Sequence, residues 1–142
     1  RELLEFKPQS QKTSISNALE FLSGVMKKKA IVFVMSDFMD SGYEKTLRIV
    51  AKKHDLTGIR IYDRYEENMP NIGLVPMLDN ETGQIAWVNT QSYSVRKAYA
   101  DQYSSVVSEF ENLFHKNGAG TLHSRLDESY VIKLLNYFKS RG

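Results

Sequence analysis

The chain has 142 residues, of which 42% are hydrophobic and 25% are charged, and its formal net charge is +2 at pH 7. This length and composition predict one globular domain with a core of its own. The small net charge argues against binding to nucleic acid or to an anionic membrane surface. Because the chain contains no cysteine, it has no disulfide framework, no thiolate zinc site and no cysteine nucleophile.

The sequence contains no apolar run that approaches the roughly 20 residues needed to cross a bilayer. We therefore expect a cytoplasmic protein with no membrane segment in this chain. The first residue is Arg1 rather than methionine, which leaves open a targeting segment or a membrane anchor upstream.

Two helices are predicted before the first strand. Residues 1–7 have the pattern of a helix end, which Pro8 stops. Residues 13–26 repeat apolar side chains at helical spacing and predict a second helix. The hydroxyl side chains at its start that are suited to an N-cap are Thr13, Ser14 and Ser16.

The first predicted strand ends in a candidate site. Residues 30–35 (AIVFVM) are apolar without alternation, which is typical of a central parallel strand buried on both faces. Asp37 follows directly after Ser36, and in open α/β sheets ligands bind outside the carboxyl ends of the strands. A carboxylate there needs a partner such as a metal ion, a helix N-terminus or a basic group. Asp40 is predicted to cap the next helix.

A βαβ unit follows from the next two elements. Residues 44–53 predict a helix and residues 56–62 predict a second strand, and short joints of this kind make a right-handed unit. The second strand also ends in a carboxylate, Asp63. We therefore expect Asp37 and Asp63 to lie at the same edge of the sheet.

A loop and a hairpin are predicted next. Residues 64–71 are polar and predict the loop. Residues 74–79 and 84–88 flank a turn at 80–83, whose glycine suits a positive φ, and together they predict a β-hairpin. Trp87 on this hairpin is expected to be buried against the following helix, although tryptophan is also enriched at interface hot spots.

The last third of the chain predicts helix, strand and helix. Residues 92–116 predict a long helix whose buried stripe includes Tyr99 and Tyr103. Residues 120–126 predict a short strand, and residues 128–139 predict a closing helix capped by the aspartate before it. The whole pattern indicates an α/β fold with three parallel strands and a hairpin.

Three parallel strands make a thin sheet. The chain that follows residues 30–35 supplies only one strand that we expect to pair beside them. We therefore expect further strands, either from chain upstream of Arg1 or from a second subunit, to complete the sheet.

Several motifs resemble those of von Willebrand factor A-like domains and, more specifically, the C-terminal half of the domain-of-unknown-function family 58. The matching pieces are Lys12-Thr13-Ser14-Ile15-Ser16-Asn17-Ala18-Leu19, VFVMSDFMD, Ile61-Tyr62-Asp63 with Glu66 and Pro70, Gly73, Asp79-Glu81-Thr82-Gly83, and a closing helix that ends in Phe138 and Arg141. They span almost the whole chain in matching order and spacing.

The resemblance implies a Rossmann-like parallel sheet flanked by helices, with strand order 3-2-1-4-5-6. The run at 30–35 is then the fourth strand, and the first three strands are absent from this chain. Residues 1–142 are accordingly expected to be a single partial domain, the C-terminal part, with a β-hairpin insertion at about 72–90.

The resemblance also implies a metal-ion-dependent adhesion site, of which this chain carries an incomplete set. The aspartate-x-serine-x-serine segment of such sites belongs to the first strand and does not occur here. Thr13 resembles the threonine of the site and Asp37 its second aspartate. An ion such as Mg²⁺, which prefers hydroxyl, carboxylate and water ligands, is the expected cofactor.

By the same resemblance we expect a bacterial, non-enzymatic interaction module, an adaptor or co-chaperone that works with a MoxR-type AAA+ ATPase. Its partner-binding loops would carry Ser36, Asp40, Asp63 and Glu66. The alternative is a metal-dependent phosphoryl-transfer enzyme that uses Asp37, because an aspartate after a buried strand also begins such sites. The sequence contains no P-loop and no G-x-G-x-x-G motif, so nucleotide binding is not indicated.

Overall fold

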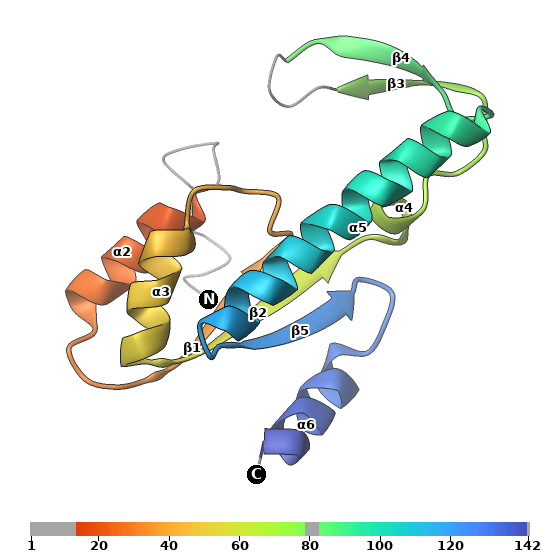
Figure 1. Ribbon diagram of the computed structural model, residues 1–142. Coiled ribbons are helices and arrows are strands. Elements are labelled where there is room, and N and C mark those ends of the chain that lie inside the picture. Colours follow the sequence, from red (N-terminus) through yellow and green to blue (C-terminus); the bar gives the residue numbers. More distant parts are fainter. Residues whose placement is uncertain (1–13, 79–82, 142) are drawn as a thin grey trace, which may run out of the picture.

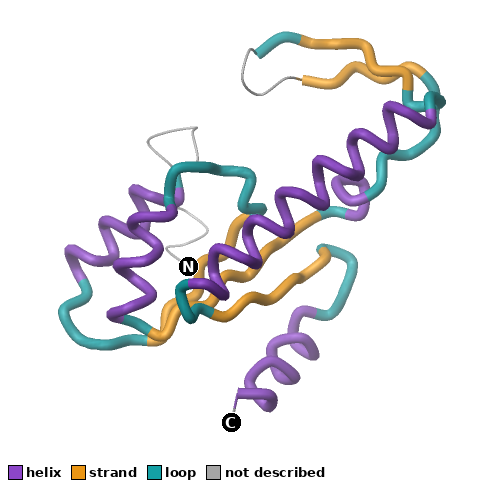
Figure 2. Tube along the Cα trace, in the orientation of Figure 1, coloured by secondary structure: helices purple, strands orange, loops and turns teal. Residues whose placement is uncertain are grey.

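The computed structural model describes residues 14–78 and 83–141, which form a mixed α/β fold (Figures 1 and 2). In chain order the elements are α2 (Ile15–Val25), β1 (Ile31–Ser36), α3 (Glu44–Lys53), β2 (Asp55–Tyr62), α4 (Arg64–Glu67), β3 (Leu74–Leu78), β4 (Ile85–Asn89), α5 (Tyr93–Lys116), β5 (Gly120–Arg125) and α6 (Tyr130–Arg141). The predictions for residues 1–8, for Thr13 and for turn residues 80–82 lie outside the described residues.

The parallel sheet has the strand order β1-β2-β5. Its register pairs Ser36 with Arg60, and Arg60 with His123, so these three residues lie in one row across the sheet near its carboxyl edge. Because strands β1, β2 and β5 all run in the same direction, the loops that follow them gather at this edge.

The predicted burial of β1 on both faces is not seen among the described residues, whereas its single neighbouring strand agrees with the prediction that this chain offers it only one. β2 is the central strand, and β1 pairs with β2 alone. Val32 is buried, but Ile31 and Met35 on the other face of β1 are 64% and 66% exposed. An unbroken apolar run predicts a strand that is covered on both faces, but among the described residues this second face of β1 is covered only in part.

One face of the sheet carries the core. Helices α2, α3 and α5 bring their apolar side chains together there with those of β1 and β2. Gly58 on the central strand allows α5 to approach closely, because a Cβ atom at this position would lie 2.6 Å from the ring of Phe114 and 2.8 Å from that of Phe110. The long helix α5 therefore lies close against β2 and runs along it (Figure 1).

Helix α6 packs on the opposite face of the sheet. The hydroxyl of Tyr137 lies 2.8 Å from that of Thr57, which is fully buried on β2. Phe138 meets Phe33 of β1 edge-on, with ring centroids 5.9 Å apart. Despite this contact with Phe33, much of the apolar side of α6 is exposed, including Leu135.

Most predicted boundaries shift by one or two residues, and two segments also differ in their structure or capping. The predicted loop at 64–71 begins with the short helix α4, because Asp63 Oδ1 accepts a hydrogen bond from the backbone N–H of Tyr65 at 2.8 Å and caps it. Helix α6 begins at Tyr130 rather than at 128, and Asp127, the predicted cap, forms an ion pair with Arg125 instead.

The hairpin β3–β4 projects from the N-terminal end of α5, away from the parallel sheet (Figure 1). Gly83 adopts the predicted positive φ, at 69°. Trp87 is 70% exposed, so its predicted burial against α5 was wrong. The register pairs Trp87 with Pro76 and Ile85 with Leu78, which places these apolar side chains on one exposed face of the hairpin.

Buried Thr90 fixes the base of the hairpin. Its hydroxyl donates to the carbonyl of Gly73 at 2.7 Å and accepts from the backbone N–H of Ile72 at 3.0 Å. Arg96 Nη1 on α5 donates to the carbonyl of Thr90 at 2.6 Å. These bonds hold the hairpin at a fixed angle to α5.

Candidate functional site

The loop after β1 turns sharply at Phe38. This residue has a φ of 57° and is 2% exposed, and its ring packs 4.2 Å from that of Phe110. Ser36 Oγ accepts a hydrogen bond from the backbone N–H of Phe38 at 3.1 Å. The left-handed conformation costs free energy, which burial of the aromatic ring offsets. The turn leaves Asp37 and Met39, on either side of Phe38, exposed at the sheet edge.

Asp37 is held by local hydrogen bonds. Its Oδ1 accepts from the backbone N–H of Met39 at 3.1 Å and from the hydroxyl of Ser36 at 3.2 Å. Within the described ranges 14–78 and 83–141, no basic side chain forms an ion pair with it. The predicted site residue therefore carries an oriented carboxylate whose charge has no partner there.

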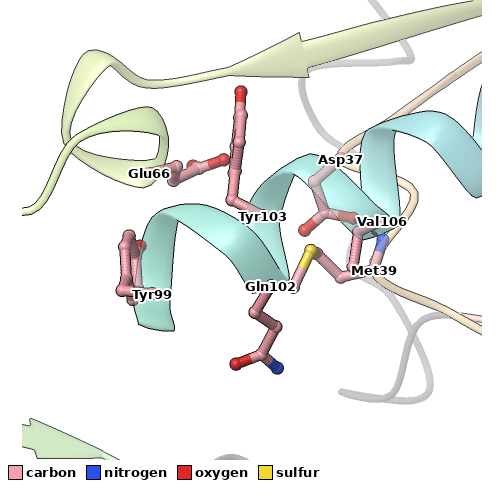
Figure 3. A pocket seen from close by; sticks show the side chains of 7 residues that line it. All are labelled: Asp37, Met39, Glu66, Tyr99, Gln102, Tyr103 and Val106. Carbon is pink, nitrogen blue, oxygen red and sulfur yellow. Dashed lines mark hydrogen bonds between the residues drawn. The ribbon is translucent and has the colours of Figure 1, made fainter. Parts of the chain in front are cut away.

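Asp37 and Glu66 line the same pocket, which has a volume of about 310 Å³ and lies between the loop after β1, α4 and α5 (Figure 3). In the close-up view, Asp37 and Met39 enter from one side, and Glu66 lies beside Tyr103 on the other. The lining side chains are Asp37, Met39, Glu66, Tyr99, Gln102, Tyr103 and Val106. Two of the residues predicted from the sequence are thus brought together, although they follow different strands.

The lining tyrosines were predicted to pack in the core, and this was only partly right. Tyr99 and Tyr103 are half-buried on α5 and face the pocket. Burial raises the pKa of the Tyr99 hydroxyl, and the charge of Glu66 raises it further. The sequence signal that could have indicated a shared site is the spacing of Tyr99 and Tyr103, which lie one helical turn apart and so share a face of α5.

Sequence reasoning missed Arg60, which lies on the central strand β2 and contacts Tyr103 of the pocket lining. Its side chain is 1% exposed, and the guanidinium carbon lies 4.7 Å and 4.6 Å from the ring centroids of Tyr62 and Tyr103. Nη1 donates to the Tyr103 hydroxyl at 2.8 Å, and Nε has no hydrogen-bond partner among the residues described. An arginine inside the apolar strand LTGIRIY was the signal.

Burial raises the pKa of Tyr103, and the hydrogen bond and charge of Arg60 act in the opposite direction. The cation–π contacts stabilise the buried charge by electrostatic attraction to the faces of the two rings. Arg60 thereby fixes the ring of Tyr103 that lines the pocket.

The other predicted loop residues have structural roles. Asp40 Oδ2 accepts from the backbone N–H of Ile15 at 2.7 Å, so Asp40 caps the start of α2 and not, as predicted, that of α3. Ser14 is the side-chain N-cap of α2, one of the three candidates. Asp63 caps α4. Neither Asp40 nor Asp63, nor Ser36, lines the pocket.

The charges of the chain are segregated between the two edges of the sheet. The segments that lead into the three parallel strands carry lysines, namely Lys27, Lys28, Lys29, Lys52, Lys53 and Lys116. The segments that leave the strands carry seven acids and, among their own residues, one basic side chain, that of Arg64; the acids are Asp37, Asp40, Asp63, Glu66, Glu67, Asp127 and Glu128. Asp127 and Glu128 form ion pairs with Arg125 at the end of β5. The carboxyl edge, where the pocket lies, is therefore acidic although the net charge of the chain is positive.

The sequence matches the profile of the family described as "Protein of unknown function DUF58" over residues 1–108, about three quarters of the chain. The chain belongs to this family. An uncharacterized protein of Mycobacterium avium, MAV169, is 22% identical over 135 residues, which cover 94% of this chain and 79% of that relative. Uncharacterized proteins of Mycobacterium tuberculosis, Rv1480, and Mycobacterium bovis, Mb1516, are each 20% identical over 139 residues.

This DUF58 chain spans 42% of the length of the M. tuberculosis and M. bovis relatives. No solved structure gives a significant match. Among the helices that the structure describes, none combines the length and the hydropathy that a membrane crossing requires.

The metal site expected from the resemblance was Thr13 with Asp37. Thr13 lies outside the described residues, and one oxygen of Asp37 already accepts two hydrogen bonds. In the described part of this DUF58 chain, no three histidine, aspartate or glutamate side chains are placed to hold an ion. The residues described thus do not by themselves fit Mg²⁺, which demands a near-octahedral set of oxygens.

Proposed function

We propose that this protein is a non-enzymatic protein-interaction module built on a von Willebrand factor A-like sheet. The observation that carries the proposal is the exposed apolar face of the hairpin, where Leu74, Leu78, Ile85 and Trp87 lie in water. A contiguous exposed patch of large apolar side chains marks an interaction site, and tryptophan is prominent at interface hot spots. Because Thr90 and Arg96 fix the base of the hairpin, the patch is presented in a defined orientation.

The open edge of β1 supports the proposed domain architecture. Ile31, Phe33 and Met35 leave an apolar strip beside the exposed side of α6. A strand paired with β1 and a helix laid next to α6 would cover this strip. The M. tuberculosis relative is more than twice as long as this chain, so the remainder of such a polypeptide is long enough to supply both.

The family resemblance suggests the partner, a MoxR-type AAA+ ATPase for which this protein is the adaptor or co-chaperone. The test uses the full-length protein and the MoxR-type ATPase encoded in the same genome, with binding followed by calorimetry. Trp87 is the only tryptophan within residues 1–142.

Replacing the two largest side chains of the patch (Trp87→Ser and Leu74→Ser) is expected to weaken binding about tenfold or more, the scale of an interface hot spot. Phe21→Ser is the matched control, since Phe21 is exposed on α2, outside the hairpin. The proposal would be contradicted if the hairpin variant bound the ATPase as tightly as the Phe21→Ser control does. It would also be contradicted if the wild-type protein did not bind the ATPase. Metal-dependent turnover of p-nitrophenyl phosphate that is lost in Asp37→Ala would favour the phosphoryl-transfer alternative instead.

A further inference from the structure

We propose that the pocket between Asp37 and Glu66 receives the side chain of a lysine or arginine that projects from a partner protein. The inference rests on the proposed function as an interaction module and specifies the chemistry that one of its sites recognises. Its basis is the make-up of the pocket, the arrangement of its two carboxylates and the charge of the surrounding edge.

The two carboxylates of the pocket have no cation of their own. Neither Asp37 nor Glu66 forms an ion pair within residues 14–78 and 83–141, and none of the seven lining side chains is basic. The two side chains enter the pocket from different sides (Figure 3). A single ammonium or guanidinium group between them would neutralise both charges with charge-assisted hydrogen bonds.

The rest of the lining suits the remainder of such a side chain. Tyr99 offers an aromatic ring, which attracts cations through its π face, whereas one face of the Tyr103 ring is already covered by Arg60. Met39 and Val106 offer apolar surface for the methylene stem that lysine and arginine both carry. A volume of about 310 Å³ is at the small end for ligand pockets and accommodates one side chain more readily than a cofactor.

The electrostatic surroundings favour a cation from the partner. The segment 63–67 carries Asp63, Glu66 and Glu67 against one exposed cation, Arg64, whereas the lysine-rich segments lie at the opposite edge of the sheet. The one buried cation nearby, Arg60, does not line the pocket and is enclosed by Tyr62 and Tyr103. An acidic edge of this kind steers a basic surface toward it and disfavours an acidic one.

A basic side chain also fits the pocket better than a bare metal ion does. The lining oxygens come from two carboxylates, the amide of Gln102 and two tyrosine hydroxyls. One carboxylate oxygen of Asp37 is already engaged by Ser36 and Met39. Mg²⁺ would require these groups to converge within about 2.1 Å of one point, whereas ammonium and guanidinium groups donate in several directions over longer distances.

The experiment titrates the full-length protein with N-acetyl-arginine amide and N-acetyl-lysine amide and follows amide NMR shifts. N-acetyl-citrulline amide is the neutral isostere of the arginine probe, and MgCl₂ is titrated separately. We expect saturable shifts centred on Asp37, Glu66 and Tyr103, with dissociation constants of roughly 1 mM or weaker. The citrulline probe is expected to cause no saturable shift.

Asp37→Asn and Glu66→Gln are each expected to weaken binding of the arginine probe about fivefold, as for a partly exposed ion pair. Glu20→Gln, which removes a charge from exposed α2, is the matched control and is expected to bind as the wild type does. Equal binding of the citrulline probe, shifts outside the pocket, no saturable shift, or Mg²⁺ binding that excludes the arginine probe would each overturn the inference.

These outcomes are distinguishable from failure of the proposed function. An ATPase that binds the wild-type protein and both pocket variants equally would overturn the pocket assignment and leave the interaction module standing. Binding of the arginine probe without binding of the ATPase would retain the pocket assignment and remove the proposed partner.

Discussion

The backbone N–H of Ile15 donates a hydrogen bond to Oδ2 of Asp40 at 2.7 Å, across 25 residues of sequence. The loop that follows β1 therefore caps the helix that precedes the same strand. The loop is held at its other end by Phe38, whose ring is buried against α5. Asp37 lies between these two anchors, so the position of the pocket carboxylate depends on both.

Replacing Asp40 is expected to destabilise the fold. Asp40→Ala leaves the first N–H of α2 without its acceptor, and the loss of a cap costs about 1 kcal/mol. Asp40→Asn keeps an oxygen in place and is expected to lose less than half of that. Chemical denaturation of both variants measures the free energy of unfolding, and an alanine variant as stable as the asparagine variant would show that this cap is unimportant.

Gly58 is expected to tolerate no side chain. Gly58→Ala would place a methyl group 2.6 Å from Phe114 and 2.8 Å from Phe110, and we expect overpacking to lower the free energy of unfolding by roughly 1–3 kcal/mol. Gly24→Ala on α2 is the control, because its Cβ would meet nothing within 4 Å and alanine favours the helix by roughly 0.5–1 kcal/mol. The thermal midpoints of the two variants should therefore move in opposite directions.

Stability at high pH is expected to depend on Tyr43. Burial, followed by the charges of Glu109, Glu44 and Asp40, raises the pKa of Tyr43 from 10.0 to about 12. The unfolded chain ionises this tyrosine from about pH 10 upward, while the folded chain keeps it neutral, so the stabilising contribution is complete below pH 10 and is lost toward pH 12.

Urea denaturation at a series of pH values checks this expectation. Tyr43→Phe should show a smaller loss of stability between pH 10 and 12 than the wild type, because it removes the group whose pKa differs between the two states. Tyr93→Phe, which changes an exposed hydroxyl, serves as the control. Superimposable pH profiles for wild type and Tyr43→Phe would contradict the assignment.

The pair of Arg60 and Tyr103 is expected to show strong coupling. Tyr103→Phe removes the hydrogen-bond acceptor of a buried guanidinium and should cost roughly 1–3 kcal/mol of stability. Arg60→Met removes the buried charge altogether, and such a replacement is often close to neutral. In the Arg60→Met background, Tyr103→Phe should therefore lower the free energy of unfolding only slightly. Additive free energies in this double-mutant cycle would mean that the two side chains act independently.

Much of the fold could be read from the sequence because its signals are local. The apolar run before Asp37, the helical periodicity before Lys116 and the glycine at 83 each depend on a few neighbouring residues. These features predicted β1 and α5 with small errors at the ends, and the positive φ of Gly83. The placement of Asp37 at the carboxyl edge also followed, since parallel strands end at the same edge.

The partners of the polar side chains could not be read in this way. Asp40 was assigned to the nearest helix in the chain, although the free N–H that it accepts from belongs to Ile15. Trp87 was assigned to the core because it is large and apolar, and no local signal says that a hairpin will project from the end of a helix. Such choices depend on distances between segments that are far apart in the sequence.

Apart from the short helix α4, the sequence by itself determined the order and type of the described elements and the carboxylate after the first strand, because backbone propensity and side-chain periodicity act within a few residues. Only the tertiary structure decided that Glu66 lines the same pocket as Asp37, since the short helix α4 must be capped by Asp63 and packed beside α5 to bring it there. It also decided that the lysines and the acids lie at opposite edges, because parallel pairing of β1, β2 and β5 aligns the segments that enter and leave the sheet.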